Sequence, residues 1–343
     1  MSEAVVTFKD VDIVFGDKPE LALPLVDQGV SRVDIQEQTG QILGVAGASF
    51  DIREGELIVL MGLSGSGKST LLRAVNGLNP VARGKVEVND GSQMVDVTNG
   101  DAATLRRIRM HHVAMVFQQF GLLPWRTVRE NVGLGLELAG LKGKEARERV
   151  DEQLALVSLS DWGDNKVSEL SGGMQQRVGL ARAFATQAPI LLMDEPFSAL
   201  DPLIRTKLQD ELLELQQRLK RTILFVSHDL DEAFKLGNHI SIMEGGRIVQ
   251  SGAPQDIFTD PRNDYVAEFV QHMNPLGVLR ARDLMKPLTS EPAETIDADS
   301  LVRDGFDTLL ASDRPIGVTE HGALIGQLGK DDVLRGLSAT DHG

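Results

Sequence analysis

The chain has 343 residues, of which 35 are Lys or Arg, 50 are Asp or Glu, 42% are hydrophobic and none is Cys. This composition is typical of a globular protein with room for two domains, and the lack of cysteine excludes disulfides, Cys-ligated metals and thiol catalysis. The net charge of −15 argues against a general nucleic-acid-binding surface, because phosphate backbones attract basic patches. Because the sequence has neither a long apolar span nor a signal-peptide profile, we expect a soluble, cytoplasmic protein.

Near the start, residues 5–15 have the pattern of a strand, and residues 17–44 separate them from the next one. Within that stretch, Ser31 and Asp34 have the spacing of a helix N-cap and its third helical residue. The spacing predicts a short surface helix, and an irregular loop is the alternative.

Farther along, short apolar runs alternate with longer amphipathic segments, which predicts an α/β fold. The runs are continuous, as expected of strands in a largely parallel sheet that helices cover on both faces. Between Gln118 and Ser171 the pattern becomes helical, with Ala146, Val150 and Leu154 in residues 144–156, and Val157 just after them, three or four residues apart. The apolar runs are residues 57–61, 113–117, 190–193 and 223–226.

The composition changes after Gly277, where short segments are broken by Pro287, Pro292 and Pro315. We therefore expect one domain over residues 1–277 and a second over residues 278–343. The second has two apolar segments, residues 301–310 and 323–328, which are few for an independent core. We expect the first to bury one side made of Val302, Phe306, Leu309 and Leu310.

Residues 62–69 fit the pattern G-x-x-x-x-G-K-[ST] between an apolar strand and a helical segment over residues 70–75. In this pattern the glycines let backbone N–H groups wrap phosphates, Lys68 reaches the β- and γ-phosphates, and Ser69 binds Mg²⁺. A plain Gly-rich turn is the alternative, and the flanking strand and helix argue against it.

Two acids follow the apolar run at residues 190–193. Asp194, at the strand end, is placed to face a metal held by the phosphate loop. Glu195, one residue beyond, is placed to polarise a water for attack on the γ-phosphate. If no phosphate loop were nearby, the alternative would be two solvated acids at the end of a strand.

Ser171 is a good N-cap, and Gly172 and Gly173 expose the first N–H groups of the following helix, which makes a second anion-binding helix start. Two phosphate grips for one nucleotide indicate two subunits that share it. With Leu170 and Gln175, this segment resembles the Leu-Ser-Gly-Gly-x-Gln signature of the ATP-binding cassette (ABC) ATPases, and the resemblance covers residues 5–270.

The resemblance implies a P-loop NTPase core with a parallel sheet, an antiparallel β subdomain, a helical subdomain at about residues 119–175, and a small α+β C-terminal module. It implies catalytic roles for Glu195, the switch histidine His228, the Q-loop Gln118 and Lys68, and Mg²⁺ ligation by Ser69, Gln118 and Asp194. Phe15 falls where the family stacks an aromatic ring on adenine, and a core Phe is the alternative. The ATP-binding residues so implied are Phe15, Gly62, Ser64, Gly65, Ser66, Gly67, Lys68, Ser69, Thr70, Ser171, Gly172, Gly173, Gln175 and Asp201 of the D-loop.

Residues 61–70, the stretch 17–44 and the tail are most similar to ATPases of quaternary-amine importers for choline, glycine betaine or proline betaine, above all choline. In those relatives the tail carries paired cystathionine-β-synthase (CBS) modules, and residues 278–343 resemble a single shortened copy. A tail that only packs is the alternative. An ABC ATPase of another importer, a soluble ABC ATPase and a nucleotide-binding regulator are the other functions considered.

The same resemblance implies a homodimer bound to two membrane permease subunits at the cytoplasmic face of the membrane, and indirectly a substrate-binding protein, with no nucleic acid. Residues 120–128 would receive a coupling helix of the permease, with Trp125 at the contact. The alternative is that Trp125 packs inside the helical subdomain.

Overall fold

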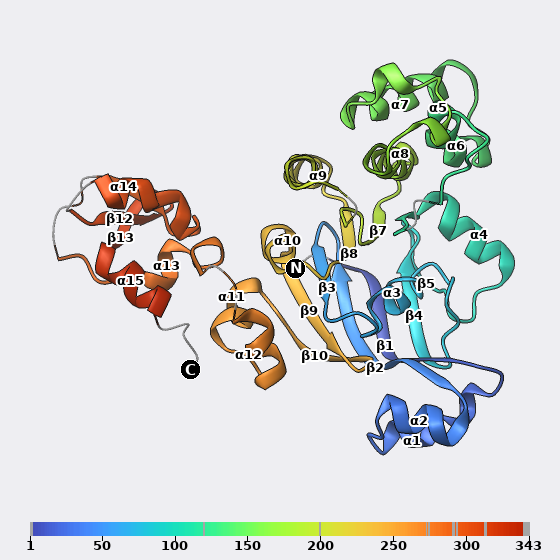
Figure 1. Cartoon of the computed structure of the whole chain (residues 1–343), viewed down its shortest axis with the longest axis horizontal. Coiled ribbons are helices and arrows are strands. Elements are labelled where there is room, and N and C mark those ends of the chain that lie inside the picture. Colours follow the sequence, from blue (N-terminus) through green and yellow to red (C-terminus); the bar gives the residue numbers. More distant parts are fainter. Residues whose placement is uncertain are drawn as a thin grey trace. The chain divides into compact units, whose positions relative to one another are not determined.

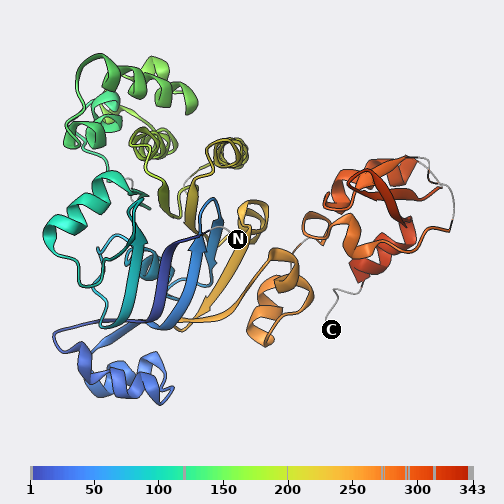
Figure 2. The same ribbon diagram turned by 180° about the vertical axis from the view of Figure 1, so that it is seen from behind.

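The computed structural model describes residues 3–118, 121–198, 200–271, 273, 275–289, 292, 294–311 and 314–338. The chain forms two compact units (Figures 1 and 2). The first combines Met1–His228 with Ser241–Ile248, and the second combines Asp229–Ile240 with Val249–Gly343. Within the described residues, no helix has the length and apolar character needed to cross a membrane.

The parallel strands of the predicted sheet lie in the first unit. The strand order of the sheet is β10-β9-β3-β8-β7-β6, and β3, β8, β7 and β6 run parallel. Every residue of β3, β7 and β8 is buried, as continuous apolar strands between helical layers require. The strands are β3 (Leu57–Met61), β6 (Val113–Val116), β7 (Ile190–Asp194), β8 (Thr222–Val226), β9 (His239–Glu244) and β10 (Arg247–Gly252).

An antiparallel sheet of order β2-β1-β4-β5 completes the core of this unit. Buried residues of β1, β3 and the helix after the phosphate loop, such as Val6, Ile58 and Leu71, belong to one hydrophobic cluster. The two sheets therefore share a core, and the predicted antiparallel subdomain is confirmed. Its strands are β1 (Ala4–Phe15), β2 (Ile42–Arg53), β4 (Arg83–Asn89) and β5 (Met94–Asp96).

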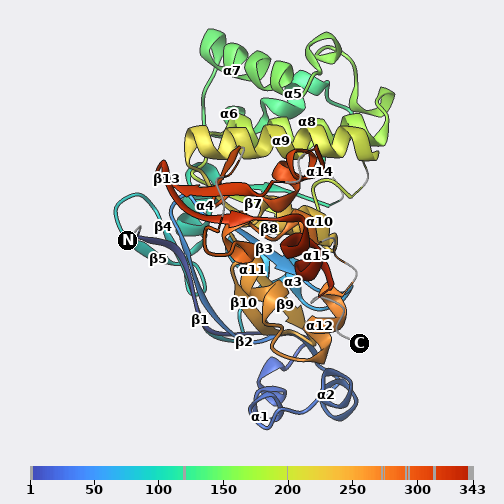
Figure 3. The same cartoon turned by 90° about the vertical axis from the view of Figure 1, so that its left-hand side faces the viewer.

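The segment after β6 is helical, as predicted. Helices α5 (Val128–Val132), α6 (Leu134–Leu138) and α7 (Gly143–Leu156) pack against α8 (Gly172–Ala185). Val150, Leu154 and Val157 are buried, and Ala146 is half-buried. Two further helices of this unit are α4 (Ala102–His111) and the long α9 (Pro202–Leu219), which Figure 3 shows along its length.

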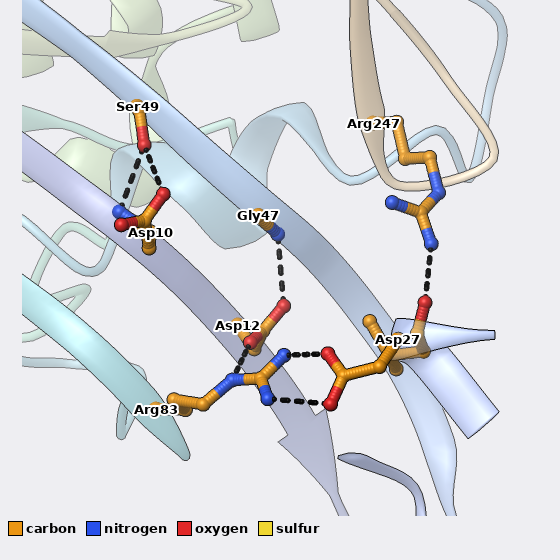
Figure 4. A network of polar contacts seen from close by, with 8 residues as sticks. Asp10, Asp12, Asp27, Gly47, Ser49, Arg83 and Arg247 are labelled. Atoms are coloured by element: carbon orange, nitrogen blue, oxygen red, sulfur yellow. Dashed lines mark hydrogen bonds and ion pairs between the residues drawn. The ribbon is translucent and has the colours of Figure 1, made fainter. Parts of the chain in front are cut away.

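The stretch between β1 and β2 folds into the turn η1 (Pro19–Leu21) and the helices α1 (Leu23–Asp27) and α2 (Arg32–Thr39), which we call the insertion. Ser31 caps α2 by accepting from the Asp34 N–H, so the predicted helix is confirmed and the irregular loop is wrong. The insertion buries Ala22, Val26 and Ile35 against β1 and β2. Figure 4 shows its contacts with Arg83 and Arg247.

The second unit ends in a three-stranded sheet of order β11-β12-β13, in which β11 is parallel and β13 antiparallel to β12. This is the predicted small α+β module. Its strands and helices are α13 (Ala281–Leu284), β11 (Thr295–Asp297), η5 (Val302–Gly305), α14 (Phe306–Ala311), β12 (Ile316–Glu320), β13 (Ala323–Leu328) and α15 (Lys330–Ser338).

One detail of this unit differs from expectation, and the predicted domain boundary is not tested. Val302 and Leu309 are buried, but Leu310 is 59% exposed, because the turn η5 precedes α14 and residues 301–310 are not one continuous helix. Val278 and Leu279 are buried in the same compact unit as the segments before Gly277, so the domain boundary there stays a prediction. Those earlier helices are α10 (Leu230–Leu236), α11 (Pro254–Thr259), α12 (Asp264–Val270) and the turn η4 (Pro275–Gly277).

Candidate active site

The phosphate loop joins the end of β3 to the start of helix α3 (Lys68–Leu72). The regular helix ends at Leu72 and a turn follows it, so the helix predicted over residues 70–75 is shorter than expected and begins two residues earlier. Gly67 caps it with φ of 103°, and a Cβ there would lie against the Gly44 carbonyl. Only glycine fits this combination of backbone angle and close approach.

Lys68 is almost fully buried at the start of α3. Its Nζ donates to the carbonyls of Gly62 at 2.8 Å and Leu63 at 2.9 Å. Burial lowers the pKa of Lys68, and the nearby carboxylates of Glu195 and Asp194 oppose that shift. The loop thus holds a desolvated cation beside backbone N–H groups, an arrangement suited to phosphates.

Asp194, the last residue of β7, is fully buried. One of its oxygens accepts from Ser69 Oγ at 2.6 Å, and the other accepts from Arg73 Nη2 at 2.8 Å. Oxygen atoms of a carboxylate, a hydroxyl and the Gln118 amide are the donors that Mg²⁺ prefers, so the predicted metal ligands have the right chemistry. Arg73 was not predicted, although its position four residues after Ser69 places both on one face of the helix.

Glu195 leaves the strand in a left-handed backbone conformation, with φ of 48°. Its Oε2 accepts a hydrogen bond from Gln118 Nε2 at 3.2 Å and lies 3.2 Å from His228 Nδ1. These three residues follow β6, β7 and β8, which are neighbours in the sheet, and the carboxyl ends of parallel strands meet at one edge. The structure therefore brings together three of the four predicted catalytic side chains.

A cavity of about 340 Å³ opens between the phosphate loop, β2 and the insertion. Phe15 is half-buried and lines the cavity, and its ring also packs against the main hydrophobic core. Its position is therefore compatible with stacking on adenine and with the alternative of a core Phe. Arg32, Ile42 and Gly44 also line the cavity and were not predicted. The predicted residues on its wall are Phe15, Ser64, Gly65, Gly67, Lys68, Ser69, Thr70, Gln118 and Glu195.

The signature residues do not line this cavity. Ser171 caps α8 by accepting from the Met174 N–H at 3.4 Å, and Asp201 caps α9 by accepting from the Ile204 N–H at 3.0 Å. Gln175 Nε2 donates to carbonyls of its own segment, those of Val167 and Leu170. A role of Ser171, Gly172, Gly173, Gln175 and Asp201 toward a partner's nucleotide stays a prediction.

Trp125 is 70% exposed, so the alternative that it packs inside the helical subdomain is wrong. Its neighbour Pro124 is exposed as well. Phe120, at the start of the expected permease contact, lies outside the described residues.

The comparisons with known proteins agree with this geometry. A family model described as ABC transporter matches residues 45–198. The ATP-binding protein ProV of the Escherichia coli glycine betaine/proline betaine transport system is 49% identical over 278 residues, which cover 81% of this chain and 68% of that protein. A dimeric ATP-binding cassette in a post-hydrolysis state with ADP and Pi superposes with a TM-score of 0.62 and 30% identity, over 72% of this chain and 98% of that one.

The chain therefore belongs to the ABC transporter family and is an ATP-binding, ATP-hydrolysing subunit of such a transporter. Within the family it is similar to the ATP-binding proteins of betaine and trimethylamine N-oxide transport systems. The trimethylamine N-oxide protein TmoW of Ruegeria pomeroyi is 41% identical over 335 residues, and the match covers 97% of both chains.

Proposed function

We propose that this chain binds ATP with Mg²⁺ as a homodimer at the cytoplasmic face of a membrane and hydrolyses it to drive uptake of a quaternary amine through two permease subunits. The observation that carries the proposal is the contact of Glu195 with Gln118 and His228 at the edge of the cavity that the phosphate loop lines.

Each residue has a role in this proposal. Adenine stacks on Phe15, and the phosphates bind Lys68 and the N–H groups at the start of α3. Glu195 accepts a proton from the water that attacks the γ-phosphorus, while the bond from that phosphorus to the bridging oxygen breaks and ADP and phosphate form. His228 and Gln118 hold the Glu195 carboxylate in position.

Ser69, Asp194 and Gln118 would hold the Mg²⁺ ion, for which their oxygen atoms are suitable ligands. When bound, the ion neutralises negative charge on the β- and γ-phosphates. Arg73 donates to Asp194 and supplies a positive charge beside a carboxylate that is fully buried.

The proposal of a homodimer rests on the separation of two anion-binding helix starts. The N-terminus of α3 lies at the cavity, whereas Ser171, Gly172 and Gly173 at the start of α8 are not among its lining residues. A second copy that places its α8 start over the first copy's phosphate loop would complete the grip on the nucleotide. The dimeric cassette with which the chain superposes supports this arrangement.

Glycine betaine is the proposed substrate because the betaine-system relatives reach 49% identity. Trimethylamine N-oxide is a second candidate, favoured by the match to TmoW over 97% of both chains. Both have a nitrogen bonded to three methyl groups and carrying a formal positive charge. Choline stays a prediction, as does a substrate-binding protein that delivers the amine to the permeases.

The experiment compares Glu195→Gln with Glu152→Gln, a matched change on the exposed face of α7. We expect Glu195→Gln to bind ATP but to lower hydrolysis by roughly 10²–10⁴-fold, the usual contribution of a general base. Uptake of labelled glycine betaine, trimethylamine N-oxide and choline, in cells where each variant replaces the native subunit, should stop with Glu195→Gln and persist with Glu152→Gln. Unchanged hydrolysis by Glu195→Gln would remove Glu195 from the base role, and amine uptake that survives it would contradict the transport function.

A further inference from the structure

The insertion is fixed to the antiparallel sheet by apolar and polar contacts. Val26 and Ile35 are buried in a small cluster with Val14, Leu43 and Ala46. Arg83 Nη1 and Nη2 form a two-point ion pair with the Asp27 carboxylate, at 3.0 and 2.6 Å. Arg247 Nη2 donates to the Val26 carbonyl at 3.0 Å (Figure 4). These contacts hold α1 and α2 in one place on the fold.

This placement brings Arg32, the first residue of α2, to the wall of the nucleotide cavity. Its Nη1 donates to the carbonyl of Gly65, in the middle of the phosphate loop, at 2.5 Å. Its Nε donates to the Leu43 carbonyl at 2.7 Å and its Nη2 to the Gly44 carbonyl at 3.2 Å, both on β2. One side chain from the insertion thus joins α2, β2 and the phosphate loop.

Arg32 makes no ion pair among the described residues, unlike several other arginines of this unit. Arg83, Arg126 and Arg129 each pair with a carboxylate, whereas the acceptors of Arg32 among the described residues are all neutral carbonyls. Arg32 is half-buried, and burial lowers its pKa, although an arginine remains charged in proteins. The half-buried cation lacks a counter-charge within the described part of the chain.

A guanidinium has five N–H groups, and three of them make the bonds to Leu43, Gly44 and Gly65. The other two have no acceptor among the described residues, and the side chain lines the same cavity as Lys68 and Phe15. An uncompensated positive charge with two available donors on this wall favours an anionic ligand with oxygen acceptors.

We propose that Arg32 is a nucleotide-positioning residue supplied by the insertion, which braces the phosphate loop through Gly65 and donates to oxygen atoms of the ribose–phosphate part of the bound nucleotide. This rests on the proposed function of the cavity as the ATP site. It gives the insertion a role in ATP binding beyond its packing on β1 and β2.

The test measures ATP affinity of the full chain by titration with a fluorescent ATP analogue at several salt concentrations. Arg32→Gln removes the charge but keeps a hydrogen-bond donor, and Arg32→Lys keeps the charge. We expect Arg32→Gln to weaken binding about tenfold and to flatten the salt dependence, as loss of one charge-assisted contact does. Arg32→Lys should retain most of the affinity and the salt dependence of the wild type.

Arg147→Gln is the matched control, because Arg147 is exposed on α7 and the change in net charge is the same. Arg147→Gln should leave the ATP affinity and its salt dependence unchanged. In Arg32→Gln, hydrolysis at saturating ATP should fall less than the ATP affinity does. If Arg32 only braces the loop, Arg32→Gln and Arg32→Lys will weaken binding equally with the wild-type salt dependence, which overturns the proposed contact.

Lys68→Ala separates the two proposals. Wild-type affinity in Arg32→Gln, together with lost binding in Lys68→Ala, overturns the role of Arg32 and leaves the ATP site intact. If the wild type and Lys68→Ala bind ATP equally poorly, the cavity is not the ATP site and both proposals fail. Melting curves of all variants confirm that the compared proteins are folded.

Discussion

Arg83 compensates a buried carboxylate, and its replacement by Met tests how much that compensation contributes to stability. Asp12 is 1% exposed on β1, where it accepts from the Gly47 N–H at 2.8 Å and from Arg83 Nε at 2.6 Å (Figure 4). Arg83→Met keeps most of the side-chain volume and removes the cation. The variant therefore leaves Asp12 buried with one neutral hydrogen bond.

The expected cost follows from the burial of the two partners. Breaking a fully buried ion pair costs about 3–5 kcal/mol, because a charge remains without compensation. The Arg83 side chain is 41% exposed, so water reaches the Asp12 carboxylate once the guanidinium is gone. We therefore expect a loss of about 2 kcal/mol, which corresponds to a fall in melting temperature of roughly 4–8 °C for a unit of this size.

The assay is thermal unfolding of Arg83→Met beside Asp27→Asn, which breaks the other Arg83 contact. Asp27 is 57% exposed, so its loss should lower the melting temperature far less. Adding Asp12→Asn to Arg83→Met should restore part of the stability, because it removes the buried charge. Equal melting temperatures of Arg83→Met and Asp27→Asn would refute the reasoning that Asp12 depends on Arg83.

Three further predictions concern the signature helix, the exposed tryptophan and the insertion. Ser171→Arg should abolish hydrolysis yet leave ATP affinity of the isolated monomer unchanged in equilibrium dialysis, and full-rate hydrolysis by a monomer would contradict the two-subunit site. Trp125→Cys, in a chain without native cysteine, should crosslink to a permease subunit in assembled transporter, whereas a thiol that reacts only with soluble reagents there would count against that contact. Ile35→Ala should destabilise the insertion by about 2–5 kcal/mol and speed hydrogen exchange in α2, and the exposed Val33→Ala should not; equal exchange would refute the packing argument.

The sequence predicted the parallel sheet and the phosphate loop because both have strong local signals. Residues 57–61 and 190–193 are continuous apolar runs, and their burial on both faces explains why they are strands. The loop motif needs particular residue types at fixed spacing, so its position was also predictable, although the helix begins at Lys68, two residues before the predicted start. The Ser31 cap located α2 for the same reason.

Residues whose roles depend on tertiary placement were not predictable. Nothing local to α2 indicates that the side chain of Arg32 reaches Gly65, because the capping signal fixes where a helix begins and not what its first residue contacts. The pairing of Arg73 with Asp194 joins residues 121 positions apart. The exposure of Leu310 follows from a turn at η5 that apolar periodicity alone does not reveal.

The two kinds of predicted site residue lie in different parts of the fold, and this difference supports the proposed two-subunit site. Gln118, Glu195 and His228 follow three adjacent strands of a buried sheet, so their separations are set by strand spacing and are already short in one chain. Ser171 and Asp201 cap α8 and α9 and do not line the cavity. A chain built this way holds the group proposed to activate water permanently near the phosphate loop. In the proposed dimer, control of hydrolysis would come from the signature contact, which we propose a second copy supplies when the dimer closes.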